Sequence, residues 1–253
     1  MFFAVFHQNA KRVARGKVGG QSPFGHRFGG PADYAGLQAF PRQPPVHLLF
    51  RLNTADPLVG ISLPKTEWLP LLCAIRYGAC GLGYKVISDD TVKIFHQVEK
   101  KAWRGFPRAG FPKILPAKPL HLSEVPYDPA DPKEVLLYEG VFGFDALTKK
   151  QFAKLVRYVK DEGIHHLWGW ETVEDYLREG GVGWPFVQGR PQDGCPDRAC
   201  RLHKKEEALR PFALFQEDDR AAKELWGPNG PNLQIIWQIC PACSAILATN
   251  QCT

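Results

Sequence analysis

The 253-residue sequence lacks the features of several large protein classes. It has no apolar run near the roughly 20 residues that a membrane-spanning helix needs. The apolar stretch from Met1 to Phe6 has no basic residue before it, so it does not have the form of a secretory signal. The net charge of +6 rules out an acidic mimic of nucleic acid. We therefore expect a cytoplasmic protein that has no membrane partner.

Recognisable catalytic motifs are also missing from the sequence. It contains no H-E-x-x-H, no G-x-S-x-G, no phosphate-binding loop and no G-x-G-x-x-G before a helix. The glycine-rich stretch from Gly78 to Gly83 lacks the Lys-Ser/Thr of a phosphate loop and is typical of a turn. We predict that the protein is not an enzyme. An enzyme whose site is assembled from distant residues remains an alternative.

The composition that is present favours a packed, β-rich protein. Hydrophobic residues make up 44% of the chain and charged residues 23%, which is typical of a globular core. The 24 glycines and 22 prolines divide the chain into short elements. We predict an α+β, mainly β fold. Lys and Arg are spread along the chain, and the densest run, Arg198 to Lys205, is short. A nucleic-acid-binding module is therefore the less favoured interpretation.

Strands are predicted wherever β-branched and aromatic runs are bounded by turn residues. The residues Ser88 to Thr91 form a tight hairpin candidate between two of these runs. The predicted strands are Val46 to Leu52, Leu71 to Tyr77, Tyr84 to Ser88, Thr91 to Phe95, Val135 to Phe142, Phe212 to Gln216, Leu233 to Ile239 and Ala245 to Thr249.

One helix, over residues 148–162, has both a start and a stop signal. Thr148 with Gln151 three residues later forms a capping box. An apolar stripe follows at helical spacing, and Gly163 suits the C-terminal end. Two shorter helices are predicted over Thr172 to Glu179 and near Asp219 to Trp226.

A weak internal repeat suggests two related halves that share one core. Val46 to Leu52 followed by Leu71 to Tyr77 in the first copy corresponds to Phe212 to Gln216 followed by Leu233 to Ile239 in the second. Seven prolines between Gly105 and Pro132 disfavour regular pairing there. This stretch is either a boundary or an ordered loop that carries a binding surface. The predicted organisation is a first half over 1–104, a Pro-rich connection over 105–132 and a second half over 133–253.

Two cysteine pairs in the second half are the strongest candidates for chemistry. Cys240 and Cys243 form a C-x-x-C directly after a predicted strand, and Cys195 and Cys200 form a C-x4-C pair upstream. Two short pairs of this kind can converge on a tetrahedral structural zinc. His203 could replace one ligand. Free thiols are the alternative, and a redox C-x-x-C is disfavoured because a strand, not a helix, is predicted to follow.

Aromatic and acidic residues supply the candidate partner surface. Trp168, Trp170 and Trp184 lie among glycines and form either part of the core or a contact surface. Acidic residues beside them and near position 218 would suit a basic partner. The complete set of candidate contact residues is Trp168, Trp170, Trp184, Glu171, Glu174, Asp175, Asp218 and Asp219.

Both halves carry short motifs at Lys17 to Gly20, the predicted strand Val46 to Leu52, Gly183 to Gly189, Phe212 to Gln216 and the run into Cys240 to Cys243. These motifs resemble those of the YwqG-like family of bacterial proteins. The chain departs from the family pattern at Arg51, where Gln is usual, and between about Ala102 and Lys133.

This resemblance implies an interaction protein rather than an enzyme. Family members are inferred to be immunity proteins against polymorphic toxins. The expected partner is thus a cognate toxin, such as a secreted nuclease effector, bound by a monomer in a 1:1 complex. A zinc-containing enzyme and a nucleic-acid-binding zinc module are the alternatives.

Overall fold

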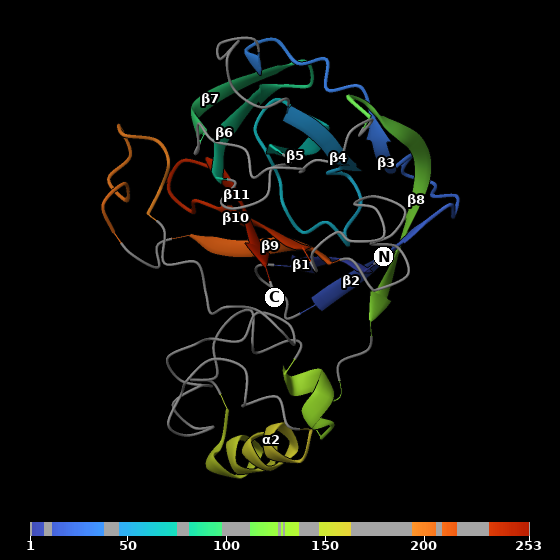
Figure 1. Ribbon diagram of the computed structural model, residues 1–253, viewed down its shortest axis with the longest axis vertical. Coiled ribbons are helices and arrows are strands. Elements are labelled where there is room, and N and C mark those ends of the chain that lie inside the picture. Colours follow the sequence, from blue (N-terminus) through green and yellow to red (C-terminus); the bar gives the residue numbers. More distant parts are fainter. Residues whose placement is uncertain are drawn as a thin grey trace.

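A computed structural model shows a mainly β protein of the α+β class (Figure 1). The structure describes residues 2–7, 12–37, 46–74, 81–97, 112–125, 128, 130–136, 147–162, 194–205, 209–216 and 233–252. Within this part of the chain it places eleven strands, the helix α2 (Lys149–Asp161) and a short helical segment at 132–136. The predicted fold class is therefore confirmed.

The strands are short, as the glycine and proline content predicts. Their bounds are β1 (Phe2–His7), β2 (Arg12–Val18), β3 (Arg27–Gly30), β4 (Val46–Asn53), β5 (Trp68–Ala74), β6 (Gly81–Ser88), β7 (Thr91–Gln97), β8 (Leu115–Val125), β9 (Arg210–Gln216), β10 (Leu233–Ile239) and β11 (Ile246–Cys252).

The strands form one antiparallel series in the order β5-β4-β3-β8-β2-β1-β9-β10-β11-β6-β7. The long strand β8 pairs with β3 through its first half and with β2 through its second half. The three C-terminal strands, β9 to β11, lie between N-terminal strands in this order, because β9 pairs with β1 and β11 pairs with β6. Both predicted halves therefore contribute strands to the same sheet.

The main core includes contacts between β4 and the strands β9 and β10, which lie apart in the strand order. Phe50 of β4 lies 5.6 Å from Phe215 of β9 and 6.2 Å from Trp237 of β10, measured between ring centroids. All three side chains are fully buried. Large aromatic rings contribute most of the buried apolar area of a core, so these contacts hold β4 against β9 and β10.

Side chains of β6 and β10 hydrogen-bond to backbone groups at the outer edge of β5. Tyr84 of β6 donates its hydroxyl hydrogen to the carbonyl of Pro70 at 2.8 Å and accepts the N–H of Leu72 at 3.2 Å. Trp237 of β10 donates its indole N–H to the carbonyl of Leu72 at 2.9 Å. The edge strand is therefore buried without leaving these backbone groups unpaired.

Most of the predicted elements are present in the structure. Seven of the predicted strands correspond to β4, β5, β6, β7, β9, β10 and β11, and the hairpin turn at Asp89 and Asp90 joins β6 to β7. Helix α2 begins after Thr148 with both hydrogen bonds of the predicted capping box. The apolar stripe of α2 packs Leu155, Val156 and Val159 against Val135 and Leu136 of the segment at 132–136.

Two predictions of secondary structure were wrong. Val135 and Leu136, expected to start a strand, lie in a helical turn that covers the apolar stripe of α2. The Pro-rich stretch was expected to exclude pairing, yet it contains β8. Pro116 and Pro119 are exposed in that strand, and the carbonyl of Pro119, which proline retains, accepts the N–H of Gly19 at 2.8 Å.

The strand neighbourhoods fit the predicted duplication. Each copy places two consecutive strands side by side in antiparallel fashion, β4 with β5 and β9 with β10. The next strand along the chain pairs differently in each copy, since β11 pairs with β10 whereas β6 pairs with β11. The predicted helices over 172–179 and 219–226 lie outside the described residues.

Candidate metal centre

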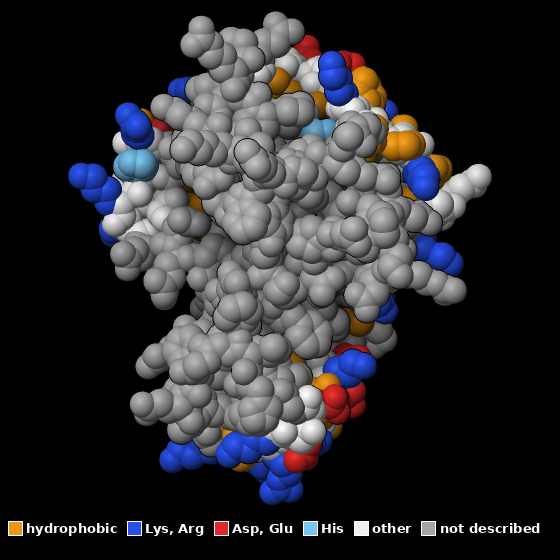
Figure 2. Space-filling model, viewed as in Figure 1, with side chains coloured by type: hydrophobic (Ala, Val, Ile, Leu, Met, Phe, Trp, Pro, Cys, Tyr) orange, Lys and Arg blue, Asp and Glu red, His pale blue; other side chains and the backbone are white. Residues whose placement is uncertain are grey.

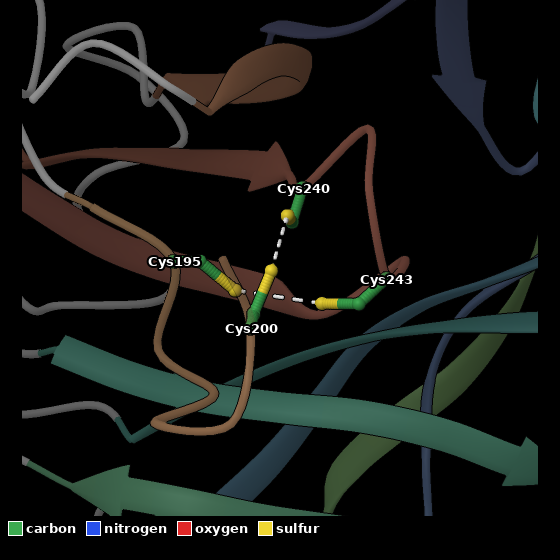
Figure 3. A group of neighbouring side chains, drawn as sticks. All are labelled: Cys195, Cys200, Cys240 and Cys243. Atoms are coloured by element: carbon green, nitrogen blue, oxygen red, sulfur yellow. Dashed lines mark hydrogen bonds between the residues drawn. The ribbon is translucent and has the colours of Figure 1, made fainter. Parts of the chain in front are cut away.

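Two segments that are far apart in the sequence carry the cysteine pairs. Cys240 and Cys243 lie in the connection between β10 and β11, while Cys195 and Cys200 lie in residues 194–205 ahead of β9. Figure 3 shows all four side chains pointing toward one another from these two segments. The structure thus brings together the four cysteines that the spacing singled out.

The distances between the sulfur atoms define a compact cluster. The four Sγ atoms all lie within 4.8 Å of one another. The Sγ atoms of Cys195 and Cys243 are 3.4 Å apart, and those of Cys200 and Cys240 are 3.7 Å apart. A disulfide would require about 2.05 Å, so the thiols are free. Four sulfurs held at about 2.3 Å from one tetrahedral ion would be about 3.8 Å apart, which matches the observed spacing.

Tight backbone turns aim the sulfurs of the C-x-x-C pair inward. The N–H of Cys240 donates to the carbonyl of Ala245 at 2.8 Å, and the N–H of Ser244 donates to the carbonyl of Cys240 at 2.9 Å. Ser244 has a φ of 59°, a left-handed conformation that costs a non-glycine residue about 1–2 kcal/mol. The rest of the turn therefore holds this residue in place.

The C-x4-C segment is folded by a similar set of local hydrogen bonds. The N–H of Cys195 donates to the carbonyl of Leu202 at 3.1 Å, and the N–H of Cys200 donates to the carbonyl of Asp197 at 3.0 Å. The N–H of Leu202 points at the Sγ of Cys200 at 3.4 Å. A backbone donor aimed at sulfur favours the thiolate form that metal ligation requires.

Burial and hydrogen bonding act on the thiols in opposite directions. Burial raises the pKa of the Cys195 thiol, and burial raises the pKa of the Cys243 thiol to about 11. The Leu202 N–H lowers the pKa of the Cys200 thiol. Since a metal ion requires thiolates, a bound cation would have to offset the cost of burying their charge.

The surroundings of the cluster are mostly apolar. Leu209, Ala245 and Leu247 are buried with Cys195 and Cys240, and Phe95 of β7 packs against them. His203, considered as a ligand from the sequence, has its Nδ1 2.6 Å from the carbonyl oxygen of Cys195. Because a carbonyl only accepts, Nδ1 carries the hydrogen, and His203 supports the backbone beside the cluster.

The donor set fits a structural metal ion. The cluster offers four sulfurs, which is the donor set that soft or borderline cations prefer. Four protein ligands complete a tetrahedral shell and leave no position for a reacting water. The four cysteines therefore form a centre that could hold one metal ion for stability rather than catalysis.

The other candidate site residues are not placed by the structure. Trp168, Trp170, Trp184, Glu171, Glu174, Asp175, Asp218 and Asp219 all lie outside the described residues. Cys73, interpreted as a small core residue, is fully buried in β5. Described Lys and Arg side chains lie at several separate places on the face in Figure 2, including a group over α2.

Sequence reasoning missed a buried polar pair. Nε2 of His26 lies 2.7 Å from Oδ2 of Asp56, and both residues are almost fully buried. The backbone N–H of Asn53 donates to Nδ1 of His26 at 2.9 Å. The two partners are 30 residues apart, and neither belongs to a recognisable motif, so the sequence offers no signal for this pair.

Comparisons with known proteins leave the chain without a family assignment. No protein-family model, curated protein or solved structure matches it. Among the described residues, no helix combines the length and apolar character needed to cross a membrane.

Proposed function

We propose that the four cysteines bind a structural zinc ion, and that the protein acts in the cytoplasm by binding and neutralising a cognate bacterial toxin. The observation that carries the zinc assignment is the convergence of four Sγ atoms within 4.8 Å. Tetrahedral all-sulfur sites are typical of zinc and of iron–sulfur clusters. Four Sγ atoms that all lie within 4.8 Å of one another leave room for one ion rather than a cluster of several atoms, which favours zinc.

A zinc ion at this centre would connect parts of the chain that are distant in sequence. It would cross-link Cys200 to Cys240 over 40 residues and Cys195 to Cys243 over 48. Residues 194–205 would thereby be fixed to the β10–β11 connection. Because such a site does not exist in the unfolded chain, the free energy of metal binding would stabilise the fold directly.

The resemblance of both halves to inferred immunity proteins supports toxin neutralisation. The motifs that carry it include the strands β4 and β9 and the knuckle at Cys240 to Cys243, which all belong to the ordered framework. An immunity protein acts by binding, so it requires a stable surface and no catalytic group. The saturated donor set of the metal centre favours this proposal over a zinc-dependent enzyme.

Toxin neutralisation sets a scale for affinity and contact area. A Kd near nanomolar corresponds to about −12 kcal/mol. Such affinity is typically reached over about 800 Å² per partner, with a few aromatic or Arg residues as anchors. The proposed contact residues are Trp168, Trp170 and Trp184 with the acidic positions near them. The positive net charge implies that attraction to a basic toxin would come from a locally acidic face.

Co-expression with the product of the neighbouring gene tests the toxin proposal. We expect the two proteins to co-purify in a 1:1 complex, and cells that express the toxin to grow only when this protein is present. A variant with Trp168, Trp170 and Trp184 changed to Ala should lose protection, while Lys160→Ala on the exposed face of α2 should keep it. Absence of both a complex and protection would contradict the proposal and favour the enzyme alternative.

A further inference from the structure

Two arginines face each other directly across neighbouring strands. Arg27 of β3 is the register partner of Arg51 of β4, and the adjacent pair is Phe28 with Phe50. Phe28 and Phe50 are in edge-to-face contact and belong to the main core. Because side chains alternate along a strand, the two arginines share the opposite face of the sheet. Like charges placed directly across a sheet destabilise it unless something offsets them.

Both arginines have a buried nitrogen without a hydrogen-bond partner. The Nε atoms of Arg27 and Arg51 are inaccessible to solvent, and neither donates to any group among the described residues. An unpaired buried donor costs about 1–3 kcal/mol, more when it is charged. Two such donors on adjacent cationic side chains call for acceptors from outside the chain, such as an anion or water.

Among the described residues, the groups around the pair leave both Nε atoms without an acceptor. Trp68 stacks under Arg51, with 4.3 Å from the guanidinium carbon to the ring centroid. Burial raises the pKa of Tyr34, and the charges of Arg51 and Arg27 act on it in the opposite direction. Asp89 brings a negative charge that acts on Arg51, but its Oδ1 accepts the N–H groups of Glu67 and Trp68 at 2.9 Å, and neither arginine Nε donates to it.

We propose that Arg27 and Arg51 together bind a small oxyanion on the outer face of β3 and β4. Guanidinium groups present planar sets of donors that match phosphate and carboxylate oxygens. One anion between the two side chains would offset their mutual repulsion and accept from their unpaired donors. The aromatic rings of Trp68 and Tyr34 would flank the anion and limit its access to water. This site is independent of the metal centre and of the proposed toxin.

Thermal unfolding in increasing inorganic phosphate, at constant ionic strength, tests the proposal. We expect a saturable rise in the Tm of the wild-type protein, which reports a bound ligand. Arg27→Met and Arg51→Met should each weaken phosphate binding at least tenfold. Arg51→Lys should weaken it as well, because lysine lacks the Nε donor. A parallel titration with acetate tells a phosphate site from a carboxylate site, and saturation by either one supports the proposal.

Lys118→Met supplies the matched control. Lys118 is the register partner of Phe28, so it lies one strand away on the face opposite the arginines, and its loss changes the net charge equally. This variant should keep the saturable rise. The proposal is overturned if phosphate and acetate give no saturation, since exclusion of salt from the surface gives a rise that does not saturate. It is also overturned if Lys118→Met weakens binding as much as Arg27→Met.

A second readout separates ligand binding from a structural role. If the pair binds an anion, Arg27→Met should leave stability unchanged or higher in buffer without phosphate or acetate, because it removes a like-charge contact. The difference from wild type should then appear as the oxyanion is added. If Arg27→Met is less stable than the wild type by the same amount without oxyanion and at saturating oxyanion, the arginines have a structural role and the proposal is overturned.

Discussion

At the scale of single residues, His26 shows how a buried polar group is fixed in one protonation state. Its Nδ1 accepts the backbone N–H of Asn53, so the ring hydrogen must be on Nε2, which faces Oδ2 of Asp56. Protonation at Nδ1 would remove the acceptor for Asn53. Burial accordingly lowers the pKa of His26 below its ordinary value of 6.5, although Asp56 opposes the shift.

Stability should therefore decrease as the pH falls below about 6.5. The unfolded chain takes up a proton on His26 near that pH, while the folded chain does so only at lower pH, so the free energy of unfolding decreases between the two values. A tenfold difference in proton affinity between the states corresponds to about 1.4 kcal/mol. Urea unfolding at several pH values between 5 and 7.5 measures the effect.

The variant His26→Asn separates this effect from other acid-sensitive groups. Its amide oxygen can still accept from Asn53, so we expect a less stable protein with a flatter pH dependence. Equal slopes for His26→Asn and the wild type would show that His26 does not cause the pH dependence.

At the scale of elements, local signals predicted structure well where neighbouring residues determine it. Thr148 and Gln151 form the capping box of α2 within one turn, and Asp89 with Asp90 turns the chain between β6 and β7. Strand β8 could not be predicted in this way, because its prolines suggest a loop until β2 and β3 supply partners. Strands β1 to β3 were missed because their burial depends on segments more than 80 residues away.

The hydroxyl of Tyr84 pairs with two backbone groups at the outer edge of β5. Tyr84→Phe would leave the N–H of Leu72 and the carbonyl of Pro70 buried without a partner. We expect the free energy of unfolding to fall by about 2 kcal/mol. Denaturant unfolding compares this variant with Tyr158→Phe, whose half-exposed ring on α2 should make the same change nearly neutral. Similar losses in both variants would mean that the hydroxyl of Tyr84 does not stabilise the edge of β5.

At the scale of the whole molecule, the candidate metal centre could be predicted although the sheet order could not. The C-x-x-C after a strand and the C-x4-C upstream each form a local turn that presents two sulfurs. Only the convergence of the two turns on one site depends on the overall fold. The sequence carries no comparable signal for the pairing of β1 with β9 or of β11 with β6. Any exposed strand edge offers the same backbone donors and acceptors, so no side-chain pattern identifies the partner strand. The Arg27–Arg51 pair was missed for the same reason, since it exists only through the register of β3 and β4.

The metal content of the purified protein tests the central claim most directly. Elemental analysis of protein prepared under reducing conditions should find about one zinc per chain in the wild type, because four thiols converge on a single tetrahedral position. Cys240→Ser should lose most of the zinc and unfold at a lower temperature. Cys73→Ala, which changes a buried cysteine of β5 outside the cluster, should retain it. Wild-type protein without metal, or equal zinc in Cys240→Ser and the wild type, would contradict the account.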